Sequence, residues 1–184
     1  MKKIFKILAI SGSLRKLSTN TLFLKTMANF CPSNITFEIY NHLNKLPFFN
    51  PDDDIEGLNL IEVEKWRSAL ANADMIVLVS PEYAHGVTGV MKNALDWIVS
   101  SGELLDKPLA FPNISLRAEI AYSHLLEILD VMGCKLLEDC SPRSTLTTPY
   151  MLADATEKML LEDPEIIERI KALWKNIESN LSNF

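Results

Sequence analysis

Residues 80–97 read SPEYAHGVTGVMKNALDW, a turn-rich loop that opens directly into a helix. Pro81 fixes one φ angle, while Gly86 and Gly89 permit backbone conformations that a residue with a Cβ resists. From residue 90 onward the apolar positions recur with helical spacing, which predicts a helix over 90–101. In open α/β sheets, ligands bind outside the carboxyl ends of the strands, where such loops lie. This loop is therefore the first candidate for a binding site.

The predicted helix carries one narrow polar stripe on a mostly apolar rod. At about 100° per residue, the polar residues of the stripe fall within roughly one 100° arc; they are Lys92, Asn93, Asp96 and Ser100. Apolar residues cover most of the remaining circumference, which is more than one face of a sheet needs. On this ground we expect a homodimer or a dimer of dimers, that is, a homotetramer.

Length and composition indicate a single globular domain over residues 1–184. The chain has 48% hydrophobic and 23% charged residues, which is ordinary for a folded domain of this size. A net charge of −6 leaves no basic footprint for nucleic acid or an anionic membrane. The apolar runs are too short to span a membrane, and no signal peptide is recognised, so we expect a cytoplasmic protein.

Neither the cysteines nor the aspartates have a spacing typical of a metal site. Cys31, Cys134 and Cys140 form no Cys-x-x-Cys pair, so we expect reduced, mostly buried thiols. Residues 52–54 are three consecutive aspartates, which cannot all converge on one ion. We expect a solvated loop there, with metal binding as the lesser alternative.

Apolar runs and alternating patterns predict five strands. Near-continuous apolar runs at 4–10, 75–79 and 109–111 indicate strands buried on both faces. Residues 35–40 alternate between apolar and polar, as in an edge strand with one exposed face, and a fifth strand is expected within 134–140. Helices are expected from Ser18 to about Phe30, around residues 63–73, over 90–101, from Ile120 to Gly133, and after the Asp163 cap with Pro164 first.

This alternation predicts a three-layer α/β fold with a five-stranded parallel sheet and right-handed crossovers. The second strand has the pattern of an edge strand, whereas the first and third have the pattern of central strands. The flavodoxin-like order 2-1-3-4-5 satisfies both conditions and places its switch point between strands one and three. The loops at that crevice are 11–20 and 80–89.

The loop at 11–20, SGSLRKLSTN, combines hydroxyls, an amide, a guanidinium and a helix N-terminus. The free N–H groups and dipole of a helix N-terminus favour an anion, so this loop is a candidate phosphate site. It matches neither the dinucleotide nor the nucleoside-triphosphate glycine motif, which argues against a kinase or hydrolase. Simple helix capping is the alternative explanation, and the position at the switch point favours phosphate binding.

Together, GSLRKLSTN and SPEYAHGVTGVMKNALDW resemble the NADPH-dependent FMN reductase family of flavodoxin-like proteins. KPLAF, the following residues 115–118 and the helix end DVMG extend this resemblance over roughly residues 4–140. The resemblance implies a set of residues that hold the FMN phosphate: Ser13, Arg15, Ser18, Thr19 and Asn20. It also implies residues around the ribityl chain and isoalloxazine ring: Pro81, Glu82, Tyr83, Ala84, His85, Gly86 and Ser115.

Two positions depart from the family pattern. Ala84 stands where many members have asparagine, which removes a side-chain contact near the ring. Leu116 stands where proline is expected, which bears on the shape of the third loop. Neither departure touches the phosphate loop.

The resemblance implies an NAD(P)H-dependent oxidoreductase that carries FMN and uses NADPH, with Arg15 and Arg117 as candidate partners for the extra phosphate. We expect ping-pong hydride transfer to a flavin, quinone, azo or nitro compound or a metal oxyanion, without a catalytic side chain. His85 is expected to be a hydrogen-bonding loop residue, and Glu82 to hold the loop by accepting backbone N–H groups.

Two other classes of function stay open. One is a flavodoxin-type electron carrier without nicotinamide oxidation, against which Arg15 argues because flavodoxins generally use an uncharged phosphate loop. The other is a dimeric scaffold without flavin, which Ala84 and Leu116 keep open.

Overall fold

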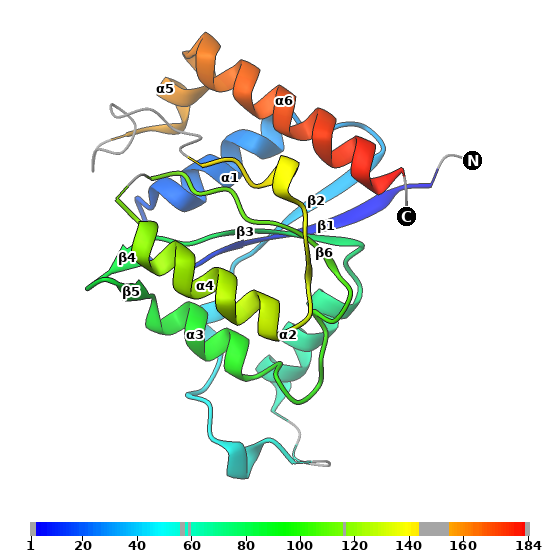
Figure 1. Cartoon of the computed structure of the whole chain (residues 1–184), viewed down its shortest axis with the longest axis vertical. Coiled ribbons are helices and arrows are strands. Elements are labelled where there is room, and N and C mark those ends of the chain that lie inside the picture. The colour runs from blue at the N-terminus through cyan, green and yellow to red at the C-terminus, as the bar shows by residue number, and fades with distance from the viewer. Residues whose placement is uncertain (1–2, 56–57, 59, 116, 144–154, 183–184) are drawn as a thin grey trace.

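The computed structural model describes residues 3–55, 58, 60–115, 117–143 and 155–182. Its centre is a five-stranded parallel sheet in the order β2-β1-β3-β6-β7 (Figure 1). These strands are β1 (Phe5–Ser11), β2 (Ile35–Tyr40), β3 (Met75–Val79), β6 (Pro108–Ala110) and β7 (Lys135–Leu136). In chain order this is 2-1-3-4-5, so the predicted topology is confirmed.

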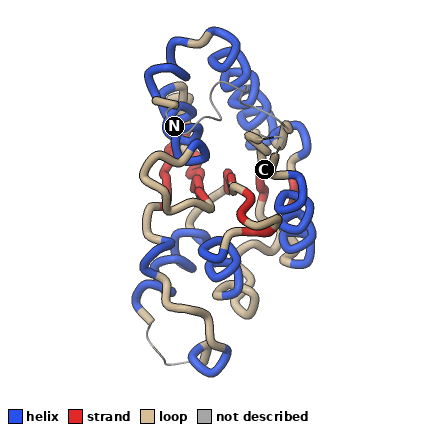
Figure 2. The backbone as a smooth tube through the Cα atoms, turned by 90° about the vertical axis from the view of Figure 1, so that its left-hand side faces the viewer, coloured by secondary structure: helices blue, strands red, loops and turns tan. Residues whose placement is uncertain are grey.

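Helices cover both faces of the sheet, as the two views in Figures 1 and 2 show. The helices are α1 (Thr19–Asn29), α2 (Ile61–Ala71), α3 (Gly89–Asp96), α4 (Glu119–Val131), α5 (Glu157–Glu162) and α6 (Pro164–Leu181). Short 3-10 turns occupy Leu43–Lys45, Pro51–Asp53 and Glu138–Cys140. One face of the sheet packs against α2, α3 and α4, and the other against α1, α5 and α6.

The central strands are buried on both faces because both faces are covered. Leu8 and Ile10 of β1 point into the core beside α2 and α3, whereas Ile7 and Ala9 point into the core beside α1 and α6. All four are at most 3% exposed, and the side chains of β3 are at most 1% exposed. In β2, by contrast, Thr36 and Glu38 are exposed, as expected for an edge strand.

Two predicted helix starts are confirmed by their caps. The Ser18 hydroxyl accepts the N–H of Thr21 at 3.4 Å at the start of α1. The Asp163 carboxylate accepts the N–H groups of Glu165 and Ile166 at 2.8 and 3.1 Å, with Pro164 as the first residue of α6. Polar side chains therefore set these helix boundaries, as the sequence predicts.

The helix predicted over 90–101 ends earlier in the structure, at Asp96, and turns follow it. Arg67 of α2 donates to the carbonyl of Trp97 through Nε at 3.0 Å and through a terminal nitrogen at 2.7 Å. The Trp66 indole of the same helix donates to the carbonyl of Ala94 at 2.8 Å, and this is the carbonyl that would accept the next helical N–H after Trp97. Side chains of α2 therefore occupy carbonyls at the end of α3 and favour a stop at this point. Helix α5 was not predicted.

The polar stripe that begins on α3 holds the segment after β2. Asn93 accepts the N–H of Phe49 at 2.7 Å and donates to the carbonyl of Pro47 at 2.9 Å. The Trp97 indole donates to the same carbonyl at 2.9 Å. The stripe is thus a support for residues 46–54, which project from the bottom of Figure 1.

The same support corrects the interpretation of the aspartate run. Asp52 and Asp53 are exposed, as predicted. Asp54, however, accepts from Ser100 at 2.6 Å and from Arg67 at 2.7 Å, with only 11% of its side chain exposed. Those two donors, the serine hydroxyl first, lower the pKa of Asp54. The prediction of a solvated loop is therefore wrong for Asp54.

The apolar circumference of the segment around α3 is buried within the subunit itself. Its buried members are at most 2% exposed: Met91, Ala94, Leu95, Trp97 and Ile98. The argument for a dimer from this feature does not hold, because the chain's own core covers these side chains.

None of the described helices is long and apolar enough to cross a membrane. The three cysteines are free thiols; Cys140 is buried and the other two are half-buried.

Candidate cofactor-binding site

Three loops meet at the carboxyl edge of the sheet, after β1, β3 and β6. The first two are joined directly: Gly12 donates to the carbonyl of Val79 at 2.8 Å, and Thr88 donates to the carbonyl of Gly12 at 2.7 Å. A Cβ on Gly12 would lie 2.3 Å from the Ser80 hydroxyl oxygen. Glycine is therefore required where the loops after β1 and β3 touch.

The loop after β1 buries its polar residues and exposes its tip. Ser13, Ser18 and Asn20 are at most 9% exposed, whereas residues 14–17 are exposed. The Ser13 hydroxyl accepts the N–H of Arg15 at 3.3 Å, and Ser18 caps α1. Each hydroxyl keeps its own O–H to donate. A helix N-terminus with two such hydroxyls favours an anion.

The loop after β3 contains a hairpin that the sequence did not predict. Its strands are β4 (Glu82–Tyr83) and β5 (Gly86–Val87), joined by Ala84 and His85. Both turn residues have positive φ values, 51° and 58°. Such a turn matches the twist of a hairpin but favours asparagine or glycine over alanine. The family asparagine that Ala84 replaces would thus suit the backbone of this turn.

Glu82 lies at the base of the hairpin with 11% of its side chain exposed. One carboxylate oxygen accepts the N–H of Ala121 at 2.9 Å, and the other lies 3.1 Å from the His85 Nδ1. These contacts, the Ala121 N–H first, lower the pKa of Glu82. The expectation that Glu82 holds the loop agrees with this geometry. His85 extends outward, with 79% of its side chain exposed.

Tyr83 links the hairpin to the loop after β1. Its hydroxyl lies 3.3 Å from the hydroxyl of Ser13, although the residue is 53% exposed. The ring therefore stands at the mouth of the site with its polar end directed at the loop after β1.

A cavity of about 170 Å³ is lined by the start of α1 and by the loops after β3 and β6. Its lining residues are Thr19, Asn20, Ser80, Pro81, Glu82, Ile114, Ser115, Arg117 and Ala118. A neighbouring cavity of about 340 Å³ on the β2 side includes Ser13 and Arg15. Seven of the twelve predicted residues therefore line one of these two cavities. Ser18 and Gly86 line neither, and Tyr83, Ala84 and His85 are exposed at the hairpin.

Asn20 provides a test of whether a cofactor fits here. The residue is 6% exposed, and its Oδ1 is buried without a hydrogen-bond partner among the described residues. Leaving a buried acceptor unpaired costs free energy, and a cofactor hydroxyl would satisfy it. Together with the helix N-terminus and the serine hydroxyls, this fits a phosphorylated, hydroxylated chain such as that of FMN. The described residues contain no cluster of His, Cys, Asp or Glu suited to a metal ion.

Sequence reasoning missed two residues that shape the site, Gly12 and Thr88. Thr88 is 2% exposed, caps α3 through the N–H of Met91 at 3.4 Å, and joins the loops after β1 and β3. A threonine directly before Gly89 and the helical pattern was the available signal. Leu116, one of the two departures from the family pattern, lies outside the described residues.

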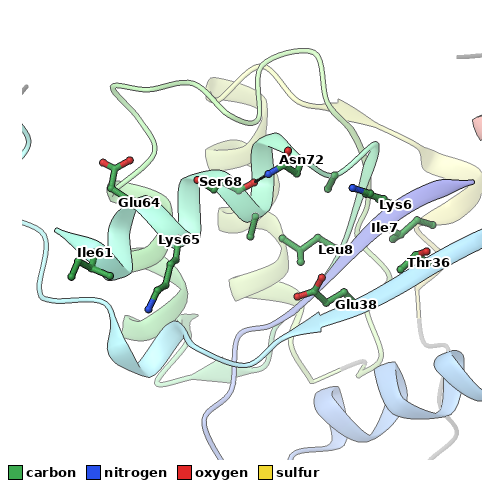
Figure 3. A pocket seen from close by; sticks show the side chains of 12 residues that line it. Lys6, Ile7, Leu8, Thr36, Glu38, Ile61, Glu64, Lys65, Ser68 and Asn72 are labelled. Atoms are coloured by element: carbon green, nitrogen blue, oxygen red, sulfur yellow. Dashed lines mark hydrogen bonds between the residues drawn. The ribbon is translucent and has the colours of Figure 1, made fainter. Parts of the chain in front are cut away.

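A larger cavity, of about 750 Å³, lies between β1, β2 and α2 (Figure 3). Lys6, Leu8, Glu38 and Lys65 are among its lining residues. None of the predicted site residues lines it, so size alone does not identify the site.

Comparison with known proteins agrees with the resemblance seen in the two loops. The sequence profile of the NADPH-dependent FMN reductase family matches residues 5–145. A 2-hydroxy-1,4-benzoquinone reductase from Burkholderia sp is 34% identical over 164 residues, which cover 86% of this chain and 87% of that protein. An NAD(P)H:quinone oxidoreductase from Solanum tuberosum is 38% identical over 96 residues, or 51% of this chain. The match spans about half the length of that relative, 50%.

Among solved structures, this chain is similar to FerB, a flavoenzyme NAD(P)H:(acceptor) oxidoreductase from Paracoccus denitrificans. The TM-score is 0.68 at 20% sequence identity, and the match covers 94% of this chain and 99% of that one. At this identity the likeness shows a shared fold. With the profile match over most of its length, the chain belongs to the NADPH-dependent FMN reductase family.

Proposed function

We propose that this chain is an NAD(P)H-dependent, FMN-containing oxidoreductase that passes reducing equivalents to a small acceptor. The observation that carries the proposal is the buried Oδ1 of Asn20 beside the N-terminus of α1, which has no hydrogen-bond partner in the part of the chain that the structure describes. It lies in a cavity lined by the loops after β3 and β6 as well. Family membership supports FMN and a nicotinamide nucleotide as the redox pair.

The proposed phosphate-holding residues are Ser13, Arg15, Ser18, Thr19 and Asn20. Ser13 and Ser18 accept backbone N–H groups and can each donate an O–H outward. Arg15 adds a positive charge to this set, and a charge-assisted bond to phosphate is stronger than a neutral one. Asn20 can offer its amide to the phosphate and its buried oxygen to a hydroxyl of the ribityl chain.

When bound, FMN supplies the redox chemistry, since it can accept a hydride from a nicotinamide and give up electrons to an acceptor. The residues proposed around its ring are Pro81, Glu82, Tyr83, Ala84, His85, Gly86 and Ser115. Glu82 is held by Ala121, and His85 is largely exposed. We therefore assign the hairpin a binding role and propose no catalytic side chain.

We infer that both substrates approach the flavin from the same side, beside the exposed residues of the hairpin. They would then have to alternate, so ping-pong kinetics are part of the proposal. The names of the relatives favour a quinone as acceptor, with flavins, azo and nitro compounds and metal oxyanions as the other classes.

Three further expectations are retained as proposals. The resemblance favours NADPH over NADH and a homodimer or homotetramer, and the composition favours a single domain over the whole chain.

Initial-rate kinetics test this function. The purified chain, supplied with FMN, is assayed with NADPH and with NADH against a quinone, an azo dye and free flavin. Parallel double-reciprocal lines with at least one acceptor are expected. Intersecting lines would reject the shared side. The absence of nicotinamide oxidation with every acceptor would reject the enzyme in favour of an electron carrier or a scaffold.

A further inference from the structure

Helix α4 begins without a cap from its own N-cap residue. That residue is Ala118, whose methyl group cannot accept a hydrogen bond. Glu119, the acidic residue of the first turn, pairs instead with Arg143 at 2.9 Å. The first-turn N–H of Ala121 is bound by Glu82 of the hairpin, 39 positions earlier in the chain. A carboxylate at a helix N-terminus satisfies an N–H that the helix itself cannot.

Adjacent residues of β4 thus bind the hairpin to helix α4 and to the loop after β1. Glu82 reaches the first turn of α4 at 2.9 Å, and Tyr83 reaches Ser13 in the phosphate loop at 3.3 Å. Glu82 also lines the same cavity as Ser115 and Arg117, which lie just before α4. The Glu82 carboxylate therefore joins the hairpin side of this cavity to the start of α4, directly after the residues that form its opposite side.

We propose that Glu82 is a positioning residue for the cofactor, which locks the hairpin onto the first turn of α4. This inference rests on the proposed function, because the ligand whose affinity depends on this contact is FMN, bound in the cavity between the hairpin and the residues just before α4. Glu82 acts through the N–H of Ala121, so removing the Glu82 carboxylate should loosen both the hairpin and the start of α4. A direct ligand of the flavin would instead lose affinity without altering α4.

The test uses Glu82→Ala and Glu82→Gln in the full chain, with Glu127→Ala as the control. Glu127 is exposed on α4 and makes no ion pair or hydrogen bond within the described ranges. FMN dissociation constants are measured by fluorescence quenching. Amide hydrogen exchange at Ile120 and Ala121 is measured without FMN, which makes the second readout independent of the cofactor.

For Glu82→Ala we expect FMN to bind roughly tenfold more weakly, in the range of losing a helix cap, with faster exchange at both amides. Glu82→Gln keeps an oxygen that can accept the Ala121 N–H, so it should recover most of both losses. The control variant should match the wild type. If the alanine variant does not fold, Glu82→Met takes its place, because it keeps most of the bulk of the side chain without an acceptor and should show the same two losses.

Unchanged exchange at Ile120 and Ala121 in Glu82→Ala would overturn the proposal, whether or not FMN affinity falls. A glutamine variant as impaired as the alanine variant would also overturn it. If the wild type binds no FMN while Glu82→Ala accelerates exchange, the contact with α4 stands and the proposed function fails. The two failures are thereby distinguished.

Discussion

The two halves of residues 80–101 use their polar side chains for different purposes. In the first half, Glu82 contacts the first turn of α4 and Tyr83 contacts the loop after β1. In the second half, Asn93 and Ser100 hold the segment after β2. One continuous stretch of sequence thus contains a binding surface and a structural support side by side. Polar residues near a site are not part of it merely because they follow it along the helix.

The largest effect is expected on stability, from the second half. Asn93→Ala removes the acceptor for the Phe49 N–H and one donor to the Pro47 carbonyl. The Phe49 N–H is left unpaired, while the Pro47 carbonyl loses one bond and keeps the Trp97 indole. The two losses together should lower the free energy of unfolding by about 2–4 kcal/mol in urea denaturation. FMN affinity should stay within about twofold of the wild type, and a large loss of affinity without a loss of stability would reverse the comparison.

The next effect belongs to the phosphate loop and should appear in binding instead of stability. Arg15→Ala removes a charged partner of phosphate and should weaken FMN by roughly 1.5–3 kcal/mol in a fluorescence titration at moderate salt. Lys16→Ala, at the neighbouring exposed position, is the matched control and should have a smaller effect. An unchanged dissociation constant for Arg15→Ala would assign Arg15 to another role.

The pH dependence of stability provides a further test of the second half, through Asp54. Its pKa is lowered from 3.8 by Ser100 and Arg67. A lowered folded-state pKa contributes stability that is present above the unfolded pKa and is lost as pH falls through the folded pKa. Asp54→Asn should therefore cost about 1–2 kcal/mol at neutral pH, and the difference should shrink in acid. Asp52→Asn, at an exposed position, should change neither the free energy of unfolding nor its dependence on pH. Equal effects of the two substitutions would contradict the pairing of Asp54 with Ser100 and Arg67.

A smaller gain is expected at the tip of the hairpin. Ala84 has a φ of 51°, a conformation that asparagine tolerates better than alanine. Ala84→Asn should raise the free energy of unfolding by about 0.5–1 kcal/mol, measured by thermal denaturation. A destabilised variant would show that the side chain at this position matters more than the backbone of the turn.

The smallest effect should come from His85. Its side chain is 79% exposed and lies beside a carboxylate already bound by Ala121. His85→Ala should change turnover by less than about tenfold, because losing a general acid or base typically costs 10²–10⁴. A thousandfold loss in steady-state turnover would make His85 a proton-transfer residue.

Features of the fold that depend on local patterns were predictable from the sequence. The apolar runs of β1 and β3 predicted central strands, and Ser18 and Asp163 predicted where α1 and α6 begin. The hairpin was not predicted because its strands are too short for a visible alternation, and its turn lacks the Asn-Gly pair that usually marks one.

Parts of the site that depend on distant partners were not predictable. Ser18 and Asn20 were proposed from the resemblance, and their burial could be seen only in three dimensions, as could the place of Asn20 in the lining of a cavity. The partner of Glu82 is a backbone N–H on another helix, and a backbone group has no sequence signature. Asp54 differs from its two neighbours only because α2 and the turns after α3 bring Arg67 and Ser100 to it.

The most direct test of the central claim is an anaerobic half-reaction. The FMN-loaded chain is mixed with NADPH in the absence of any acceptor, and the visible absorbance of the flavin is followed in a stopped-flow instrument. The account predicts binding of one FMN per chain, bleaching by NADPH at least as fast as steady-state turnover, and recovery of colour when a quinone is added. A chain that binds no FMN, or a bound flavin that NADPH and NADH leave fully coloured, would contradict it.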